Sequence, residues 1–242
     1  MRFRLNFELN QASLSKEYRK KFISFLKASF KGYDESLYEQ FYSTVNPKPY
    51  TFAVMLPSPS FSGNEIILGQ KSASMIFSTE DIKVAMDAYN AFCRMCGKDF
   101  YEDDSEKSMK LMSIVPLNEK TIRSRQIVVK FLSPLIVREH VRESNRDKYY
   151  AFNEDGFSEQ LASVIKVQLE NQGKFFDLQG FSLTPLDEKS AKKSVILHYG
   201  QYIDASLGVY IMTGSPELLQ YLYQSGISSR RSAGFGLFDV IE

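Results

Sequence analysis

Residues 215–241 read SPELLQYLYQSGISSRRSAGFGLFDVI, and this stretch decides the fold class. Ser215 is a favourable N-cap residue and Pro216 suits the first helical position, so we expect a helix to begin there. Gly226 is expected to end that helix, and the apolar residues at the end of the stretch predict a last strand over 236–241. A helix followed by a closing strand is how a β-α-β-β-α-β unit ends.

The rest of the second half supplies the other members of such a unit. Period-two alternation of apolar residues predicts strands, and apolar residues at helical spacing predict a helix. The expected strands cover residues 125–132, 175–183, 193–199 and 201–213, and the expected helix covers residues 153–171.

The first half follows the same order. Phe3, Leu5 and Phe7 alternate with polar residues and predict a strand over 2–9. Ser13 or Ser15 is expected to cap the next helix, with an aromatic stripe facing inward and lysines facing outward. The remaining expected elements are a short helix over 35–42, strands over 50–55, 65–68, 72–77 and 109–116, and a helix that starts near Thr79 or Asp81 and ends near Met95.

Two such units account for the length of 242 residues. The sequence therefore predicts an α+β fold of two tandem ferredoxin-like (RRM-like) domains, over residues 1–118 and 119–242. The acidic segment 99–106 is expected to be a solvated connection.

The composition excludes several classes of protein. With 43% hydrophobic residues the chain can bury a core, which excludes wholesale disorder. The formal net charge is +1, so a basic surface must be local. Residues 15–31 carry six Lys or Arg and one Glu, and residues 120–150 carry eight basic and three acidic residues. The start of the chain has no apolar signal segment and no apolar run is long enough to span a membrane, so we expect a cytoplasmic protein without a membrane partner.

Cys93 and Cys96 form a C-x-x-C pair, but no second pair or nearby histidine completes a zinc set. We interpret them as reduced core thiols adjacent on a helix, with a metal or redox role as the alternative. No metal site and no cofactor is predicted. The two histidines, His140 and His198, are both interpreted as structural, with His140 exposed or facing a ligand and His198 in the core or in a groove.

The loop over residues 226–236 is the most specific motif. Its glycines permit positive φ and close approach to a ligand, while Arg230, Arg231 and three serines, among them Ser232, supply donors for phosphate oxygens. The alternative is a tight connection between helix and strand, which explains the glycines better than the adjacent arginines. We favour the ligand-binding interpretation.

This loop resembles the glycine-rich signature of the CRISPR-associated endoribonucleases that cut precursor CRISPR RNA within its repeats. Four other segments agree: Lys48-Pro-Tyr-Thr-Phe52, Phe77-Ser78, Phe131-Leu-Ser-Pro134 and Gly214-Ser-Pro-Glu-Leu-Leu219. The resemblance spans nearly the whole chain and implies two ferredoxin-like domains side by side, with RNA along the cleft between them.

The resemblance also implies an activity. It implies metal-independent cleavage, in which the ribose 2′-hydroxyl attacks the adjacent phosphate and leaves 2′,3′-cyclic phosphate and 5′-hydroxyl ends. The implied partner is CRISPR repeat RNA, with other subunits of a CRISPR effector complex as an option, and the chain is expected to be a monomer or a homodimer.

The catalytic residues are where the chain departs from the family. Many members place a histidine shortly before the Lys-Pro-aromatic segment, and alignment on Lys48 puts that position at or near Tyr42. Residues 1–139 contain no histidine. We therefore predict Tyr42, Tyr38 and Lys48 as catalytic residues, and we expect slow cleavage because free tyrosine has a pKa of about 10.

The predicted RNA-binding residues lie on the first long helix, at the start of the second half and in the loop. They are Lys20, Lys27, Lys31, Arg125, Gly226, Arg230, Arg231, Ser232, Gly234 and Gly236.

Two alternative functions stay open. One is a subunit that binds CRISPR RNA without cutting it, which the missing histidine favours. The other is a nucleotide-binding regulatory α+β protein, although the sequence has neither G-x-x-x-x-G-K-[ST] nor a strand-initiated G-x-G-x-x-G.

Overall fold

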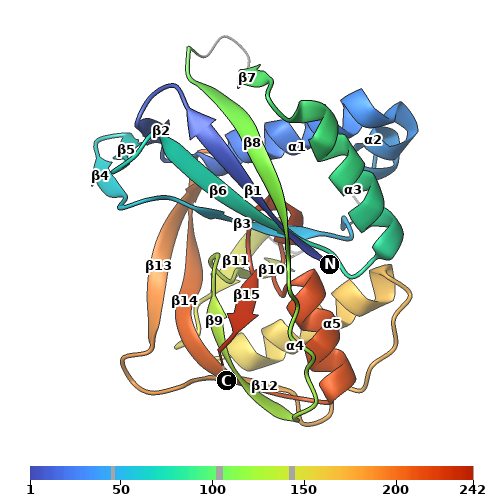
Figure 1. Ribbon diagram of the computed structural model, residues 1–242. Helices are drawn as coiled ribbons and strands as arrows, with labels where there is room; N and C mark the ends of the chain where they lie inside the picture. Colours follow the sequence, from blue (N-terminus) through green and yellow to red (C-terminus); the bar gives the residue numbers. More distant parts are fainter. Residues whose placement is uncertain (45–46, 102–105, 142–144, 242) are drawn as a thin grey trace.

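The computed structural model describes residues 1–44, 47–101, 106–141 and 145–241. It contains two α+β units, one above the other in Figure 1, and each combines an antiparallel sheet with helices. The first unit is the upper one and the second unit is the lower one.

The first unit is built on a five-stranded sheet in the order β3-β6-β1-β8-β7. Its main elements follow one another as β-α-β-β-α-β, the order of a ferredoxin-like domain. They are β1 (Arg2–Leu9), α1 (Arg19–Tyr33), β3 (Thr51–Met55), β6 (Ser72–Ser78), α3 (Ile82–Met95) and β8 (Ser108–Leu117).

The second unit repeats this plan with the strand order β12-β14-β9-β15, and β13 pairs with β14. Its elements are β9 (Gln126–Phe131), α4 (Phe157–Asn171), β12 (Ser182–Pro185), β13 (Ala191–His198), β14 (Gln201–Thr213), α5 (Pro216–Ser225) and β15 (Phe238–Val240). The α+β class with two tandem ferredoxin-like domains is thereby confirmed. The boundary between residues 118 and 119 stays a prediction.

Smaller elements complete the molecule. They are β2 (Ser13–Ser15), β4 (Ser60–Ser62) and β5 (Glu65–Ile67) in one sheet, β10 (Val137–Val141) and β11 (Arg146–Tyr150) in another, the edge strand β7 (Asp99–Tyr101), α2 (Glu35–Tyr42), and a 3-10 turn at Arg231–Ala233. No helix among the described residues is long and apolar enough to cross a membrane.

Each unit has its own aromatic core. In the first, Phe7 on β1 meets Phe22 and Phe25 on α1 edge to face, with ring centres 5.4 and 5.1 Å apart. In the second, Phe131 on β9 meets Phe238 on β15 at 5.7 Å. Such pairs add about 0.5–1.5 kcal/mol each beyond the burial of their area.

A buried interface joins the two units. Leu237, just before β15, packs with Ala53 and Ile76 of the first sheet. Arg2 at the start of β1 is buried, and its Nη2 donates to the carbonyl oxygen of Phe238 at 2.8 Å and to that of Tyr223. The last segment of the second unit is therefore bonded to the first strand of the first unit.

The helix predicted at residues 215–225 is confirmed together with its caps. Ser215 Oγ accepts a hydrogen bond from Leu218 N at 3.2 Å, and Pro216 occupies the first helical position. Gly226 follows the helix with φ +71°. These local signals are strong because capping side chains satisfy N–H groups that have no partner inside the helix.

Two predicted helix starts are wrong. The helix expected after Ser13 or Ser15 begins at Arg19, because residues 13–15 pair with β5 as a short strand. The helix expected from residue 153 begins at Phe157, after Gly156 with φ +86°. In both cases the chain makes a turn before the helix that helical periodicity alone does not reveal.

Two connecting segments also differ from the predictions. Over residues 175–183 the predicted strand is reduced to β12, which starts at Ser182, and Phe175 is 90% exposed. The predicted acidic connection over 99–106 contains β7, which pairs with β8. Residues 102–105 of that connection lie outside the described residues.

Cys93 and Cys96 are both exposed, so the prediction of core thiols is wrong. Cys93 lies on α3 and Cys96 follows the last residue of that helix. The basic face of α1 is also only partly as predicted. Of the lysines predicted to face outward, Lys27 and Lys31 are exposed and Lys20 is half-buried, whereas Lys16 lies before the helix begins.

Candidate nucleic-acid interface

The loop over residues 226–236, called the glycine-rich loop below, joins α5 to β15 and packs on the first unit. Thr51 Oγ1 at the start of β3 lies within hydrogen-bonding distance of the carbonyl oxygens of Phe235, at 3.1 Å, and Arg231, at 3.4 Å. Arg19 Nε on α1 donates to the carbonyl oxygen of Gly234 at 3.3 Å. The loop is therefore held by both units of the molecule.

The glycines of this loop have structural reasons to be glycines. Gly226, Gly234 and Gly236 have φ of +71°, +86° and +72°. A Cβ at Gly234 would lie 2.7 Å from the Phe52 ring, and one at Gly236 would lie 2.0 Å from the carbonyl oxygen of Ile227. Both contacts are too short for a real side chain. Direct contact of these glycines with RNA stays a prediction.

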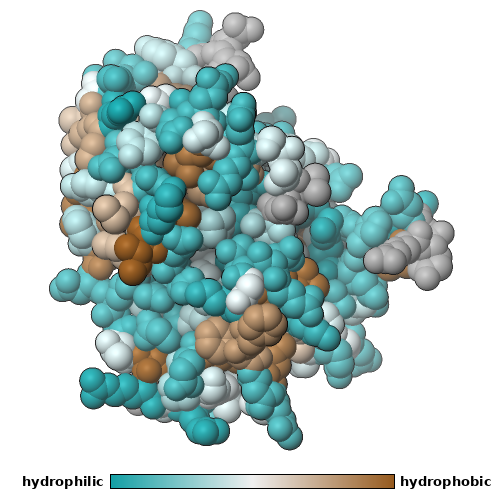
Figure 2. Space-filling model, turned by 90° about the vertical axis from the view of Figure 1, so that its right-hand side faces the viewer, coloured by the Kyte–Doolittle hydropathy of each residue, from teal (hydrophilic) through white to brown (hydrophobic). Residues whose placement is uncertain are grey.

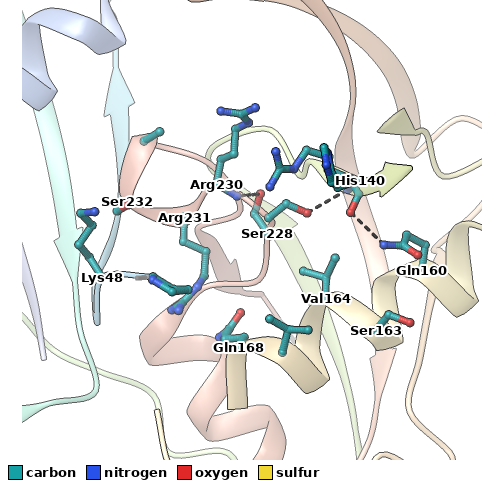
Figure 3. Close-up of a pocket in the computed structure, with 15 residues that line it drawn as sticks. Lys48, His140, Gln160, Ser163, Val164, Gln168, Ser228, Arg230, Arg231 and Ser232 are labelled. Carbon is teal, nitrogen blue, oxygen red and sulfur yellow. Dashed lines mark hydrogen bonds between the residues drawn. The ribbon is translucent and has the colours of Figure 1, made fainter. Parts of the chain in front are cut away.

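Arg231 and Arg230 point to opposite sides of the loop (Figure 3). Arg231 is 5% exposed, and its Nη1 donates to the carbonyl oxygen of Ser225 at 2.7 Å. Burial lowers the pKa of Arg231 to about 10, so the side chain is still charged at neutral pH. Its Nη2 has no hydrogen-bond partner among the described residues.

Arg230 is half-buried and belongs to a polar network on the second unit. Its Nη2 donates to Tyr149 Oη at 3.1 Å and lies 3.5 Å from Asp147 Oδ2. Arg138 Nη1 and His140 Nδ1 each lie 2.9 Å from the carboxylate oxygens of the same Asp147. Arg230 therefore remains near the surface, whereas Arg231 is buried.

The three predicted catalytic residues lie together in a tyrosine–lysine cluster on α1, α2 and the segment before β3. Tyr38 and Tyr42 have ring centres 5.1 Å apart, and Lys48 Nζ lies 5.4 Å from the Tyr42 ring. Lys27 Nζ lies at the same distance from that ring, and Lys31 Nζ lies 5.6 Å from the Tyr38 ring. The cluster therefore joins aromatic faces to three ammonium groups.

The electrostatics of the cluster limit what each group can do. Burial raises the pKa of Tyr42 above its ordinary value, and Tyr42 Oη is 2.6 Å from Tyr50 Oη. The hydroxyl is consequently neutral at physiological pH and acts through hydrogen bonds rather than as a base. Burial, and to a lesser degree Lys27, lowers the pKa of Lys48, which makes its ammonium a better proton donor.

Two predicted RNA-binding residues belong neither to the loop nor to the cluster. Lys20 Nζ is paired with Glu17 at 2.6 Å and lies 4.9 Å from the Tyr199 ring. Arg125 is exposed next to Gly214, at the opposite end of β9 from the glycine-rich loop. Six residues of strand separate those ends by roughly 20 Å.

A cavity of about 490 Å³ lies between the glycine-rich loop and α4. Its lining brings together Lys48, Arg230, Arg231 and Ser232, which the sequence predicted. It also includes Ser228 and Ser229 of the same loop, and residues that sequence reasoning missed: Arg138, Gln160, Ser163, Val164, Val167 and Gln168. Five of them share one face of α4 at helical spacing, and the sequence can indicate that shared face but not the cavity that the face lines.

The two histidines have different surroundings. His140 is exposed and lines the same cavity, in keeping with its prediction. His198 is buried, with ring centres 4.6 Å from Tyr199 and 5.1 Å from Phe235. Burial is the main reason that its pKa is lowered to about 4. In the part of the chain that the structure describes, no group of three or more His, Cys, Asp or Glu side chains is placed to hold a metal ion.

Two curated relatives match along most of the chain. The CRISPR-associated endoribonuclease-like protein Cas6nc of Pyrococcus horikoshii is 24% identical over 226 residues, which cover 87% of this chain and 92% of that protein. The CRISPR-associated endoribonuclease-like protein Cas6 of Pyrococcus furiosus is 22% identical, with 87% and 91% covered.

Solved structures share the fold along the whole chain. A Cas6-related protein from Pyrococcus furiosus has a TM-score of 0.84 at 18% identity, with 100% of this chain and 98% of that chain covered. A RAMP protein described as binding different RNA substrates has a TM-score of 0.83 at 20% identity, with both chains fully covered.

The sequence model of the family described as CRISPR associated protein Cas6, C-terminal, matches residues 117–240. This match covers the whole second unit, including the glycine-rich loop. The relatives and the shared fold extend the similarity into the first unit. The chain belongs to the Cas6 family of CRISPR-associated proteins.

Proposed function

We propose that this protein binds CRISPR repeat RNA and cleaves it within the repeat, without a metal ion, by attack of a ribose 2′-hydroxyl on the adjacent phosphate. Family membership and relatives described as endoribonuclease-like support RNA processing as the function class. Repeat RNA is the proposed partner, and the products are a 2′,3′-cyclic phosphate and a 5′-hydroxyl.

One observation carries the proposal: Lys48 belongs both to the tyrosine–lysine cluster and to the cavity beside the glycine-rich loop. RNA that followed the cations of the cavity would therefore reach the predicted catalytic residues. The surface on the right-hand side of Figure 1 is largely hydrophilic and has separate apolar patches (Figure 2).

The chemistry assigns a role to each group. The 2′-oxygen forms a bond to phosphorus, the bond from phosphorus to the 5′-oxygen breaks, and the 2′-proton passes to solvent. Lys48 stabilises the charge of the phosphorane and donates a proton to the leaving 5′-oxygen. Tyr42 and Tyr38 orient the ribose and the phosphate. Because no side chain in this scheme accepts the 2′-proton, catalysis depends on in-line positioning and is slow.

A second candidate function is a subunit that binds CRISPR RNA without cutting it. The specific observation in its favour is that the Tyr42 hydroxyl is engaged with Tyr50 and that burial raises its pKa. Residues 1–139 also lack the histidine that many family members carry.

End-labelled repeat RNA incubated with the protein in EDTA separates the two functions. The endoribonuclease gives one defined cut, whereas the binding subunit gives only a shift in mobility. A repeat RNA with a single 2′-deoxy nucleotide at the cut position is the matched control. It should bind equally and stay intact, and its cleavage would rule out the proposed 2′-hydroxyl attack.

A further inference from the structure

The cavity beside the glycine-rich loop has an unbalanced set of charges. Among the described residues that line it, four are Lys or Arg and none is Asp or Glu. Asp147 nearby offsets Arg138 and Arg230, with which it pairs at 2.9 and 3.5 Å. It makes no such pair with Arg231 in the described part of the chain. The cavity therefore favours an anionic occupant.

Arg231 adds a buried charge to this set. Its Nη1 is fixed by the carbonyl oxygen of Ser225, while Nη2 is buried without a hydrogen-bond partner in the described part of the chain. In Figure 3 its side chain extends from the loop toward Gln168 on α4. A buried charge without a counter-charge is costly, and an anion in the adjoining cavity would offset that cost.

Gln168 has a hydrogen-bond acceptor that a phosphate alone would leave without a donor. Its Nε2 donates to the carbonyl oxygen of Gly226 and to Ser225 Oγ, both at 3.0 Å. The Gly226 carbonyl can only accept, so the amide nitrogen must face it. The remaining Gln168 Oε1 is a buried acceptor without a partner. A phosphate carries only acceptors, whereas a nucleobase carries donors as well.

The α4 wall supplies an apolar surface beside these polar groups. Val164 and Val167 line the cavity next to Gln160 and Ser163. The volume of about 490 Å³ lies within the range of about 300–1,000 Å³ that is typical of small-ligand sites. Cationic groups next to an apolar surface can hold the phosphate and the base of one unstacked nucleotide.

We propose that this cavity holds one unpaired nucleotide of the bound RNA, with its phosphate against the cations of the glycine-rich loop and its base against Val164 and Val167 of α4. The inference rests on the proposed function, since its ligand is the RNA. A paired base cannot enter, because the nucleotide must leave its stack to reach α4. The helix α4 is thereby assigned a part in RNA recognition.

Two exposed serines on α4 provide a matched test. Ser163 lines the cavity and Ser158 does not, and both are exposed. Ser163→Glu places a carboxylate in the cavity and is expected to weaken repeat-RNA binding about tenfold or more, while Ser158→Glu changes it less than about twofold. Thermal melting of both full-length variants shows that the fold is retained. Equal affinities for the two variants would overturn the nucleotide site.

Removal of single bases from the repeat RNA tests which part of the nucleotide enters. At one position of the repeat, removal of the base is expected to weaken binding to the wild-type protein about fivefold. The same removal is expected to weaken binding to the Val167→Ser variant less than about twofold, because the side chain that packs on that base is absent from the variant. If every abasic position costs both proteins equally, no base occupies this cavity and the nucleotide site fails. Failure of the wild-type protein to bind any repeat RNA would instead refute the proposed function itself.

Discussion

Arg230 and Arg231 are adjacent in the chain, but their surroundings differ, and substitution separates their roles. Arg231→Ala removes a buried side chain that bonds the Ser225 carbonyl, so we expect a loss of about 2–4 kcal/mol in unfolding free energy. Arg230→Ala is expected to weaken repeat-RNA binding about tenfold with little change in melting temperature, because Arg230 lies near the surface. Melting curves and binding at one fixed salt concentration check both. The reverse pattern would show that the roles are exchanged.

Lys48 and Tyr42 carry the predicted chemistry. Under single-turnover conditions with saturating protein, Lys48→Ala and Tyr42→Phe are each expected to slow cleavage about tenfold or more, at about 1.4 kcal/mol of barrier per tenfold, with RNA affinity little changed. Tyr50→Phe is the matched control, since it removes the same Tyr42–Tyr50 hydrogen bond but keeps the Tyr42 hydroxyl. Equal slowing by Tyr50→Phe would mean that the pair supports only the structure.

His198 makes stability depend on pH. Burial, with smaller contributions from Arg230 and Arg19, lowers its pKa to about 4 in the folded protein, against about 6.5 in an unfolded chain. Between these values the unfolded state binds a proton that the folded state does not, so stability falls as pH falls through this window. We expect a loss of about 1 kcal/mol from pH 7 to pH 5, which His198→Phe removes. Urea unfolding at both pH values measures it, and an unchanged pH dependence in the variant would contradict the assignment.

Among the elements, the glycine-rich loop has a tightly constrained backbone. Gly236→Ala would place Cβ 2.0 Å from the Ile227 carbonyl oxygen, so we expect a loss of more than about 3 kcal/mol in unfolding free energy. Gly200→Ala is the control, because Gly200 has φ +75° but no atom within 4 Å of the added carbon. That control should lose only about 1 kcal/mol. Equal losses, measured by chemical denaturation, would show that φ alone matters.

Elements with local signals could be predicted from the sequence. The helix α5 carries Ser215, Pro216 and Gly226 at the positions where caps act, and its bounds match the prediction. The strand β2 was missed because residues 13–15 become a strand only through pairing with residues 65–67, far along the chain. The order of elements was therefore predictable, whereas short strands made by distant partners were not.

In the candidate site, too, some features could be predicted from the sequence and others depend on distant contacts. Family resemblance placed Tyr42 and Lys48 in the first unit and Arg231 in the loop, but no local pattern reveals that α4 lines the same cavity. That proximity depends on contacts such as Gln168 Nε2 with the carbonyl oxygen of Gly226, 58 residues away. The periodicity of α4 identifies a face, and only the packing of the fold shows what the face meets.

For the molecule as a whole, a formal net charge of +1 means that RNA affinity must come from local cations. If about four Lys or Arg side chains contact phosphates, log K should fall with log salt with a slope of about −3 for single-stranded RNA. Filter binding from low to moderate salt measures the slope. A slope near zero would contradict phosphate binding, and a slope unchanged in Arg230→Ala would remove that residue from the contacts.

The bonds from Arg2 to Tyr223 and Phe238 also set an order of events during synthesis. They join residues separated by 221 and 236 positions, so at about 20 residues per second a ribosome needs about ten seconds or more after adding Arg2 to supply its partners. During that time the first unit can fold, while the Arg2 guanidinium remains hydrated because its carbonyl partners have not been synthesised. The glycine-rich loop lies between the two partners in the chain, so a chain that ends before residue 226 can have a folded first half but lacks the loop that completes the proposed RNA site.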